Sequence, residues 1–356
     1  MLPARLRHRV AAGRCSEWPT DCSDHRVSRQ STLAPGVPCG STMSSADSTD
    51  APPRPPVATP RRHLGPLQKL GLFCLALLVG AVALSAFWQL LRLPPQLQHG
   101  TIHAWPLLGA GALALGLVLS VTGLLVRRSE GRGLDTVGLP LAPRALRTVA
   151  LGLLIGAVPA ALVVLLSSAS GGVEIEWQPW SLRSLLTTTL PMAAALILLS
   201  SWEEVAFRGY PMQLVASASR PRVAAVISGL AFGLLHAGNP AANVAGLVYT
   251  AIGGALLATL VQRTGALWLA CGYHAGWNVT AALVFGLRES GIVHAGALAR
   301  TRLLGPDWLT GGGYGFEAAP WSLVVEIIVL ALCLRFASRL PGEPAARPWF
   351  AGAKNA

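Results

Sequence analysis

Ionisable and amide side chains interrupt apolar stretches in the middle of this sequence, at spacings that could serve hydrolysis. A carboxylate and an imidazole around one water molecule can deprotonate it for attack on a carbonyl carbon. A second imidazole and an amide can donate hydrogen bonds to the oxyanion that forms. The segments EEVAFR, FGLLH and HAGWN supply these groups and their immediate neighbours: Glu203, Glu204, Arg208, Phe232, His236, His274 and Asn278.

Spacing along a helix indicates which of these side chains can meet. Glu204 and Arg208 are four residues apart, so they share a helix face and can pair. The guanidinium would hold its partner carboxylate ionised. Glu203 points roughly 100° away from Glu204, which leaves it free to face another group as the more tunable carboxyl. His274 and Asn278 are also four apart and project from one face together.

Three helices must bring these groups to a common depth. His236 lies about fourteen residues into its apolar run and His274 about eight, which gives depths of about 21 and 12 Å. If the helix that carries EEVAFR runs on through Arg208, Glu203 reaches a similar level. Gly276 offers a flat surface for close packing of the HAGWN helix. The pattern therefore predicts one buried polar site shared by three helices.

The composition indicates that this site lies in a membrane. The 356 residues are 52% hydrophobic and 12% charged, with a mean hydropathy of +0.51. Soluble domains carry about 25% charged residues. Runs of about twenty apolar residues recur, each long enough to span a hydrocarbon core. They are continuous rather than alternating, which argues against a β-barrel. We expect an all-α, polytopic integral membrane protein of about eight transmembrane helices with a buried polar active site.

The apolar runs and the composition between them divide the chain. Expected spans are about 68–91, 104–126, 146–168, 185 to as far as 212, 222–238, 242–262, 266–287 and 320–336. The expected domains are a disordered basic leader at 1–63, N-terminal helices at 64–180, a catalytic core at 181–290, an irregular outer loop at 291–319, and a last helix with a tail at 320–356. Met43 opens a polar stretch that resembles a natural leader, so we expect translation to start there.

The basic residues set the predicted orientation. The net charge is +12, and most arginines flank spans or crowd the N-terminal stretch. By the positive-inside rule both termini are expected in the cytoplasm. Arg288, Arg300 and Arg302, in the outer loop, are exceptions. No soluble segment offers a basic surface large enough for nucleic acid, so we expect none as a partner. High Ala, Arg and Gly content favours a bacterial cell membrane as the location.

Several other site types are absent from the sequence. The six cysteines form no CxxC pair, which argues against a disulfide scaffold or a thiolate metal site. There is no HExxH zinc-peptidase helix and no GxSxG nucleophile elbow. No aspartate lies in any expected span, which excludes an intramembrane protease with two catalytic aspartates.

The ordered set EEVAFR, FGLLH and HAGWN resembles the CPBP family of intramembrane glutamic endopeptidases, also called the CAAX protease or ABI family. The resemblance covers about residues 185–290. It implies that Glu203 and His236 activate water, that His274 and Asn278 stabilise the oxyanion, and that other motif residues support the site or bind substrate: Glu204, Arg208 and Phe232. It also implies a peptide or protein substrate within or at the lipid bilayer, and bacterial members have roles in bacteriocin self-immunity and surface-protein maturation.

Alternatives remain open from the sequence. The main one is a proteolytically inactive membrane scaffold or bacteriocin self-immunity protein of the same fold. A transporter is a third reading, but the polar residues show no inverted repeat. We expect no cofactor, although Glu203, His236 and His274 could ligate zinc. Glu326 interrupts the last span near its outer end, and we expect it to be a packing or interfacial residue.

Overall fold

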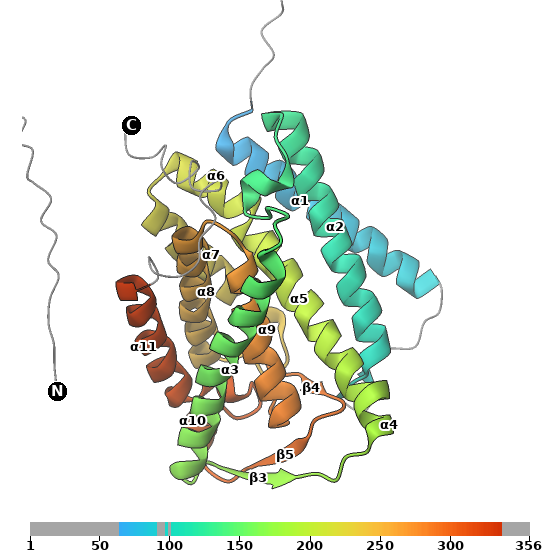
Figure 1. The fold of residues 1–356 in the computed structure, drawn as a ribbon, viewed down its shortest axis with the longest axis vertical. Helices are drawn as coiled ribbons and strands as arrows, with labels where there is room; N and C mark the ends of the chain where they lie inside the picture. The colour runs from blue at the N-terminus through green and yellow to red at the C-terminus, as the bar shows by residue number, and fades with distance from the viewer. Residues whose placement is uncertain (1–63, 91–96, 99–100, 337–356) are drawn as a thin grey trace, which may run out of the picture. The chain divides into compact units, whose positions relative to one another are not determined.

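The computed structural model describes residues 64–90, 97–98 and 101–336, and these form a helical assembly with two small sheets (Figure 1). The expected leader at 1–63, the start at Met43 and the tail beyond 336 lie outside the described residues. The α-helices are α1 Pro66–Leu90, α2 Ala104–Glu130, α3 Ala145–Ala169, α4 Leu182–Ser184, α5 Leu190–Arg208, α6 Tyr210–Ala218, α7 Pro221–Leu235, α8 Val244–Thr264, α9 Trp268–Val279, α10 Asp307–Thr310 and α11 Pro320–Phe336.

Shorter helical turns extend several of these helices. They are the 3-10 segments η1 Leu134–Val137, η3 His236–Gly238 and η5 Phe316–Ala318, and the π-helical segments η2 Leu185–Thr189 and η4 Thr280–Val284. In hydrocarbon every backbone N–H and C=O must be satisfied within the segment, which a helix achieves and an open strand does not. The apolar runs therefore fold as helices.

The prediction of an all-α membrane protein is confirmed by six helical runs, among the residues that the structure describes, that are long and apolar enough to cross a membrane. They are Pro66–Ala83, Ala104–Glu130, Ala145–Ala169, Leu182–Ala218, Pro221–Gly238 and Val244–Thr264. Helices also form over the remaining two expected spans, as α9 with η4 and as α11, but both are shorter. A total of eight spans, the domain boundaries, the cytoplasmic termini and the bacterial cell membrane stay predictions.

The helix that carries EEVAFR ends at Arg208, earlier than the expected limit at Met212. At Gly209 the backbone turns, with ψ at −122°, and α6 begins at Tyr210 with Pro211 in its first turn. A Cβ at Gly209 would lie 2.5 Å from the carbonyl oxygen of Val205, so only glycine fits this close turn. The break places Arg208 at the last position of α5, still inside the helix.

Glycines allow α3 and α9 to pack closely. A Cβ at Gly276 would lie 2.2 Å from the Leu153 carbonyl oxygen, and one at Gly272 would lie 2.2 Å from that of Val149. Small residues of this kind let helix backbones approach and gain dispersion contacts in a membrane. His274 lies between the two glycines on α9, so the packing of α9 against α3 sets the position of His274.

The segment between η4 and α11, expected to be irregular, contains regular structure. Strand β5, Ala299–Leu303, pairs antiparallel with β3, Val173–Trp177, at the lower end of the helices in Figure 1. A second sheet joins β1 Leu97–Gln98, β2 Thr101–Ile102 and β4 Val293–His294. A tight turn precedes β4, with positive φ at Ser290 (47°) and Gly291 (85°). These contacts hold residues 289–294 against the helices.

Candidate active site

A buried ion pair links the second glutamate of EEVAFR to its arginine. Arg208 Nη1 donates to Glu204 Oε1 over 2.9 Å, and both side chains are fully buried. Arg208 Nη2 also donates to the Gly254 carbonyl of α8 over 3.0 Å. The guanidinium carbon lies 4.2 Å from the centre of the Phe232 ring, within the range of a cation–π contact. Arg208 therefore joins α5, α7 and α8.

His274 contacts both glutamates from α9. Its Nδ1 donates to Glu204 Oε1 over 3.0 Å, because a carboxylate oxygen can only accept. Its Nε2 lies 3.7 Å from Glu203 Oε2. Glu204 is thus engaged by a cation and an imidazole, whereas the Glu203 side chain stays 23% exposed. The two adjacent carboxylates have different surroundings, as their divergence on the helix predicts.

His236 follows the last turn of α7, in η3. Its Nδ1 donates to the Phe232 carbonyl over 2.7 Å, and its ring centre lies 4.6 Å from that of Phe232. Because a carbonyl oxygen only accepts, Nδ1 carries a proton and Nε2 of the neutral ring is an acceptor. Phe232 therefore supports His236 with its backbone and Arg208 with its ring.

Asn278 lies one turn beyond His274 and is buried. Its Nδ2 donates to Ser200 Oγ of α5 over 3.3 Å. Sequence reasoning did not single out Ser200, although it stands three residues before Glu203, on the same side of α5. This contact ties the amide to the helix that carries the glutamates.

A cavity of about 330 Å³ brings the three motifs together. Its polar lining from helices and their ends is Ser200, Glu203, His236, Asn239, Thr250, His274 and Asn278, and its apolar lining includes Leu196, Leu199, Trp202, Phe232 and Leu235. Of the seven residues predicted for the site, five line this cavity, while Glu204 and Arg208 are buried beside it. The predicted depths of Glu203, His236 and His274 in the membrane had indicated that the three motifs meet. Helix α5 ends at Arg208 and α7 ends at Leu235, and the motif residues still meet at the cavity.

The segment after η4 supplies a second group of polar side chains to the same cavity, and sequence reasoning missed it. This group, here the loop wall, consists of Glu289, Ser290, His294 and Glu317. Glu317 Oε2 accepts hydrogen bonds from Ser290 N over 2.5 Å and from Ser290 Oγ over 2.7 Å. His294 Nε2 lies 3.8 Å from Glu289 Oε2. The sequence offered one signal for this group: Glu289 and His294 lie on either side of Ser290–Gly291, a residue pair typical of turns.

Glu326 takes the first of its two expected roles, that of a packing residue. It is buried, and it lines a small cavity of about 40 Å³ with His274, Asn278, Glu317 and others. The reason is that the first turns of α11 pack against α8 under the loop, where a Cβ at Gly253 would lie 2.8 Å from Glu326 Oε1. A cavity of this size can hold a water molecule.

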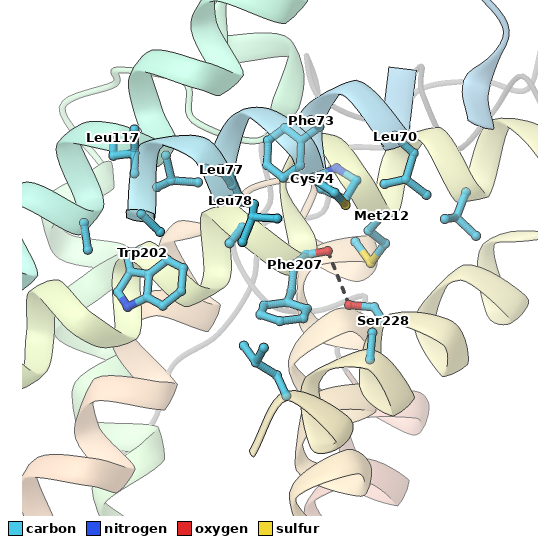
Figure 2. Close-up of a pocket in the computed structure, with 18 of the residues that line it drawn as sticks. Leu70, Phe73, Cys74, Leu77, Leu78, Leu117, Trp202, Phe207, Met212 and Ser228 are labelled. Atoms are coloured by element: carbon cyan, nitrogen blue, oxygen red, sulfur yellow. Dashed lines mark hydrogen bonds between the residues drawn. The ribbon is translucent and has the colours of Figure 1, made fainter. Parts of the chain in front are cut away.

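A larger, apolar cavity of about 890 Å³ lies among α1, α2, α5, α6 and α7. Figure 2 shows Phe73, Leu77 and Leu78 of α1 facing Phe207 and Trp202 of α5 across it. Trp202 and Leu235 line both this cavity and the polar one. An apolar chamber thus adjoins the polar site.

The zinc site that the sequence left open is not matched by the geometry. Within the described ranges, no group of three or more His, Cys, Asp or Glu side chains is arranged to hold a metal ion. Glu203, His236 and His274 line one cavity without forming such a group. That the chemistry needs no cofactor stays a prediction.

Comparison with known proteins adds one finding to this geometry. No curated protein matches the chain. Residues 185–280, which contain all three motifs, match the family model described as type II CAAX prenyl endopeptidase Rce1-like. The resemblance predicted from EEVAFR, FGLLH and HAGWN is confirmed: this chain is an integral membrane protein in which residues 185–280 match the Rce1-like type II CAAX prenyl endopeptidase family model.

Proposed function

We propose that this protein is an intramembrane endopeptidase that hydrolyses a peptide bond with water activated by Glu203 and His236, without a metal ion. His274 and Asn278 stabilise the oxyanion. The observation that carries the proposal is that these four side chains line one cavity of about 330 Å³. Glu204, beside them, is fully buried in its pair with Arg208.

Glu204 and Glu203 have different roles in this mechanism. Glu204 is committed to Arg208 and His274, so it supports the site rather than reacting. Glu203 keeps a partly exposed carboxylate on the cavity, and water can reach it. His236 assists as an acceptor through Nε2, since its Nδ1 is occupied by the Phe232 carbonyl. A base of this kind contributes about 100- to 10,000-fold in rate.

The oxyanion donors project from one face of α9. An imidazolium donates from both nitrogens, so His274 can hold Glu204 through Nδ1 and donate from Nε2 into the cavity. Asn278 has a second amide hydrogen besides the one it gives to Ser200. Loss of one such donor typically slows hydrolysis about 100- to 1,000-fold.

The substrate of this proposal is a peptide or protein held in the bilayer by an apolar anchor. The apolar cavity adjoins the polar one at Trp202 and Leu235, so an anchor could lie in the first while the scissile bond lies in the second. The family description names prenylated CAAX substrates, and a prenyl chain is one such anchor. Moving an apolar anchor from lipid into this cavity gives no hydrophobic gain, because lipid tails are as apolar as the cavity lining. The fit between the shape of the anchor and the shape of the cavity therefore decides which anchor binds.

The test compares the native host carrying wild-type protein with the same host carrying Glu203→Gln. Quantitative proteomics of membrane and secreted peptides is the measurement, with expression of each variant verified. Glu174→Gln is the matched control, because Glu174 lies on β3, half exposed and outside the cavity.

We expect a set of cleaved termini that is present with wild type and Glu174→Gln and is lost with Glu203→Gln. Those termini would also name the substrates. Identical peptide profiles for all three proteins would reject hydrolysis and favour the inactive scaffold or self-immunity protein of the same fold.

A further inference from the structure

The loop wall presents two carboxyl groups to the cavity that the proposed mechanism does not use, Glu289 and Glu317. Glu289 Oε2 is buried and has no hydrogen-bond partner among the described residues. Glu317 differs, because Ser290 gives its Oε2 two hydrogen bonds. These bonds hold the Ser290–Gly291 turn, and the backbones of Glu289 and Ile292 close the turn with two further hydrogen bonds. The backbone that carries Glu289 is thus held by the turn, and its side chain keeps an oxygen free of hydrogen bonds.

A second buried polar atom of the loop wall also lacks a partner. His294 Nδ1 is without a hydrogen bond in the described part of the chain, and the His294 side chain is only 4% exposed. Since buried polar atoms are normally paired, two unsatisfied groups on one wall indicate that the cavity takes polar atoms of a ligand there. A peptide bond supplies both a donor and an acceptor.

The charges around Glu289 favour its protonated form. The groups that face it are Glu203 of α5, His236 of η3, His274 of α9, His294 of β4 and Glu317 of η5. Burial raises the pKa of Glu289 well above its ordinary value, and the negative charges of Glu317 and Glu203 raise it further. Burial lowers the pKa of His294 to about 4, so this neighbour is neutral at pH 7 and gives Glu289 no cation.

Two carboxyl groups in one cavity therefore stand in contrasting surroundings. Glu203 lies beside His274 and in the next position to the Glu204–Arg208 pair, whereas Glu289 lies 3.8 Å from the neutral ring of His294 and shares its wall with the acidic Glu317. Pairs of carboxyls with environments that diverge in this way serve as base and acid in hydrolytic enzymes.

We propose that Glu289 is the general acid of the reaction and gives its proton to the nitrogen of the leaving amine. This inference rests on the proposed function. Water adds its oxygen to the carbonyl carbon while Glu203 accepts one water proton. The carbon–nitrogen bond then breaks, and the nitrogen takes the proton from the Glu289 carboxyl. The proton on Glu203 returns to Glu289 through the cavity, so one water is consumed and both glutamates are restored.

The experiment varies the leaving group. The probes are a peptide with a farnesylated cysteine followed by three C-terminal residues, and a depsipeptide twin in which an ester replaces the scissile amide. An alkoxide leaves with less need of a proton than an amine does. Wild type, Glu289→Gln, Glu203→Gln and Glu317→Gln are assayed in lipid nanodiscs by mass spectrometry, which gives kcat/KM for each probe.

We expect Glu289→Gln to slow amide cleavage by about 100-fold or more and ester cleavage by less than about 10-fold. Glu317→Gln, in the same wall, should slow both probes by one common factor, because it positions the turn. Equal loss on both probes in Glu289→Gln, or no loss on the amide, would overturn the assignment. The proposed function fails separately, when Glu203→Gln cleaves both probes as wild type does.

A second measurement needs no turnover. Infrared difference spectra recorded between pH 5 and pH 8 detect the carbonyl stretch of protonated carboxyl groups. We expect wild type to keep such a signal at pH 7 and Glu289→Gln to lose the component that Glu289 contributes. If the wild-type spectrum at pH 7 has no protonated carboxyl signal that Glu289→Gln removes, Glu289 cannot be the acid.

Discussion

The two walls of the polar cavity differ in which partners their charged groups have. The helix wall consists of Glu203, His236, His274 and Asn278, with Glu204 and Arg208 buried behind them. Their contacts include a guanidinium, an imidazole, a carbonyl and a hydroxyl, and the unsatisfied atoms Glu204 Oε2 and Arg208 Nε belong to groups that are bonded through another atom. The loop wall holds Glu289 and His294 with unsatisfied atoms and only Glu317 firmly bonded. A partnered charge holds a geometry, and an unpartnered one stays available to a ligand. The helix wall therefore positions, and the loop wall can respond to substrate.

The comparison predicts the largest loss of stability on the helix wall. Arg208→Met would leave Glu204 buried without its cation, which costs about 3–5 kcal/mol in the free energy of unfolding. Unfolding in detergent, followed by circular dichroism, measures it. Arg222→Met, at an exposed arginine of α7, is the control. A stability within experimental error of wild type would mean that the pair does not hold α5 to α8.

The next prediction separates reaction from positioning within the helix wall. Asn278→Ala should lower kcat by about 100- to 1,000-fold, because it removes an oxyanion donor. Ser200→Ala should cost less, since it removes only the hydroxyl that orients the amide. Steady-state rates for both variants give the ratio. A larger loss in Ser200→Ala would reverse these two roles.

The sequence predicted the helix wall far better than the loop wall. Four-residue spacing identified the Glu204–Arg208 pair, and apolar length identified the spans, because helix geometry converts sequence separation into direction. The end of α5 was missed, although Gly209 followed by Pro211 is a usual boundary signal. Glu289, His294 and Glu317 have no such period: a turn and two short sheets bring them to the cavity, and those contacts join residues far apart in sequence.

The loop wall gives a pH dependence with a definite sign. The pKa of His294 is about 4 in the folded protein, below its ordinary 6.5, because burial disfavours the charged ring. The folded state binds fewer protons between these values, so this contribution to stability is present above pH 6.5 and lost as the pH falls to about 4. Glu289 has a raised pKa and the opposite sign.

His294→Gln should remove that acid-side loss. We expect its unfolding temperature to fall less than that of wild type between pH 7 and pH 5, with little difference at pH 7. Thermal unfolding at the two pH values measures it, with His103→Gln, an exposed histidine, as the control. If the unfolding temperatures of wild type and His294→Gln fall equally between pH 7 and pH 5, a group other than His294 takes up the protons on unfolding.

The smallest expected effect concerns the turn on the loop wall. Glu317→Ala removes the acceptor of both Ser290 hydrogen bonds and should cost about 1–3 kcal/mol locally. Glu317→Gln keeps an acceptor oxygen and should cost less. Hydrogen exchange over residues 286–294 reports the change. Faster exchange in the Glu317→Gln protein than in the Glu317→Ala protein would contradict the role of the acceptor oxygen.

The most direct test of the account is the rate of peptide hydrolysis by purified Glu203→Gln. Wild type, Glu203→Gln and Glu174→Gln are reconstituted in lipid nanodiscs at equal folded fractions, with a peptide that spans a bond identified by the host proteomics. We predict that Glu203→Gln is slower than wild type by about 100- to 10,000-fold, while Glu174→Gln is unchanged. Cleavage by Glu203→Gln at the wild-type rate would contradict the central claim that this carboxylate activates the water.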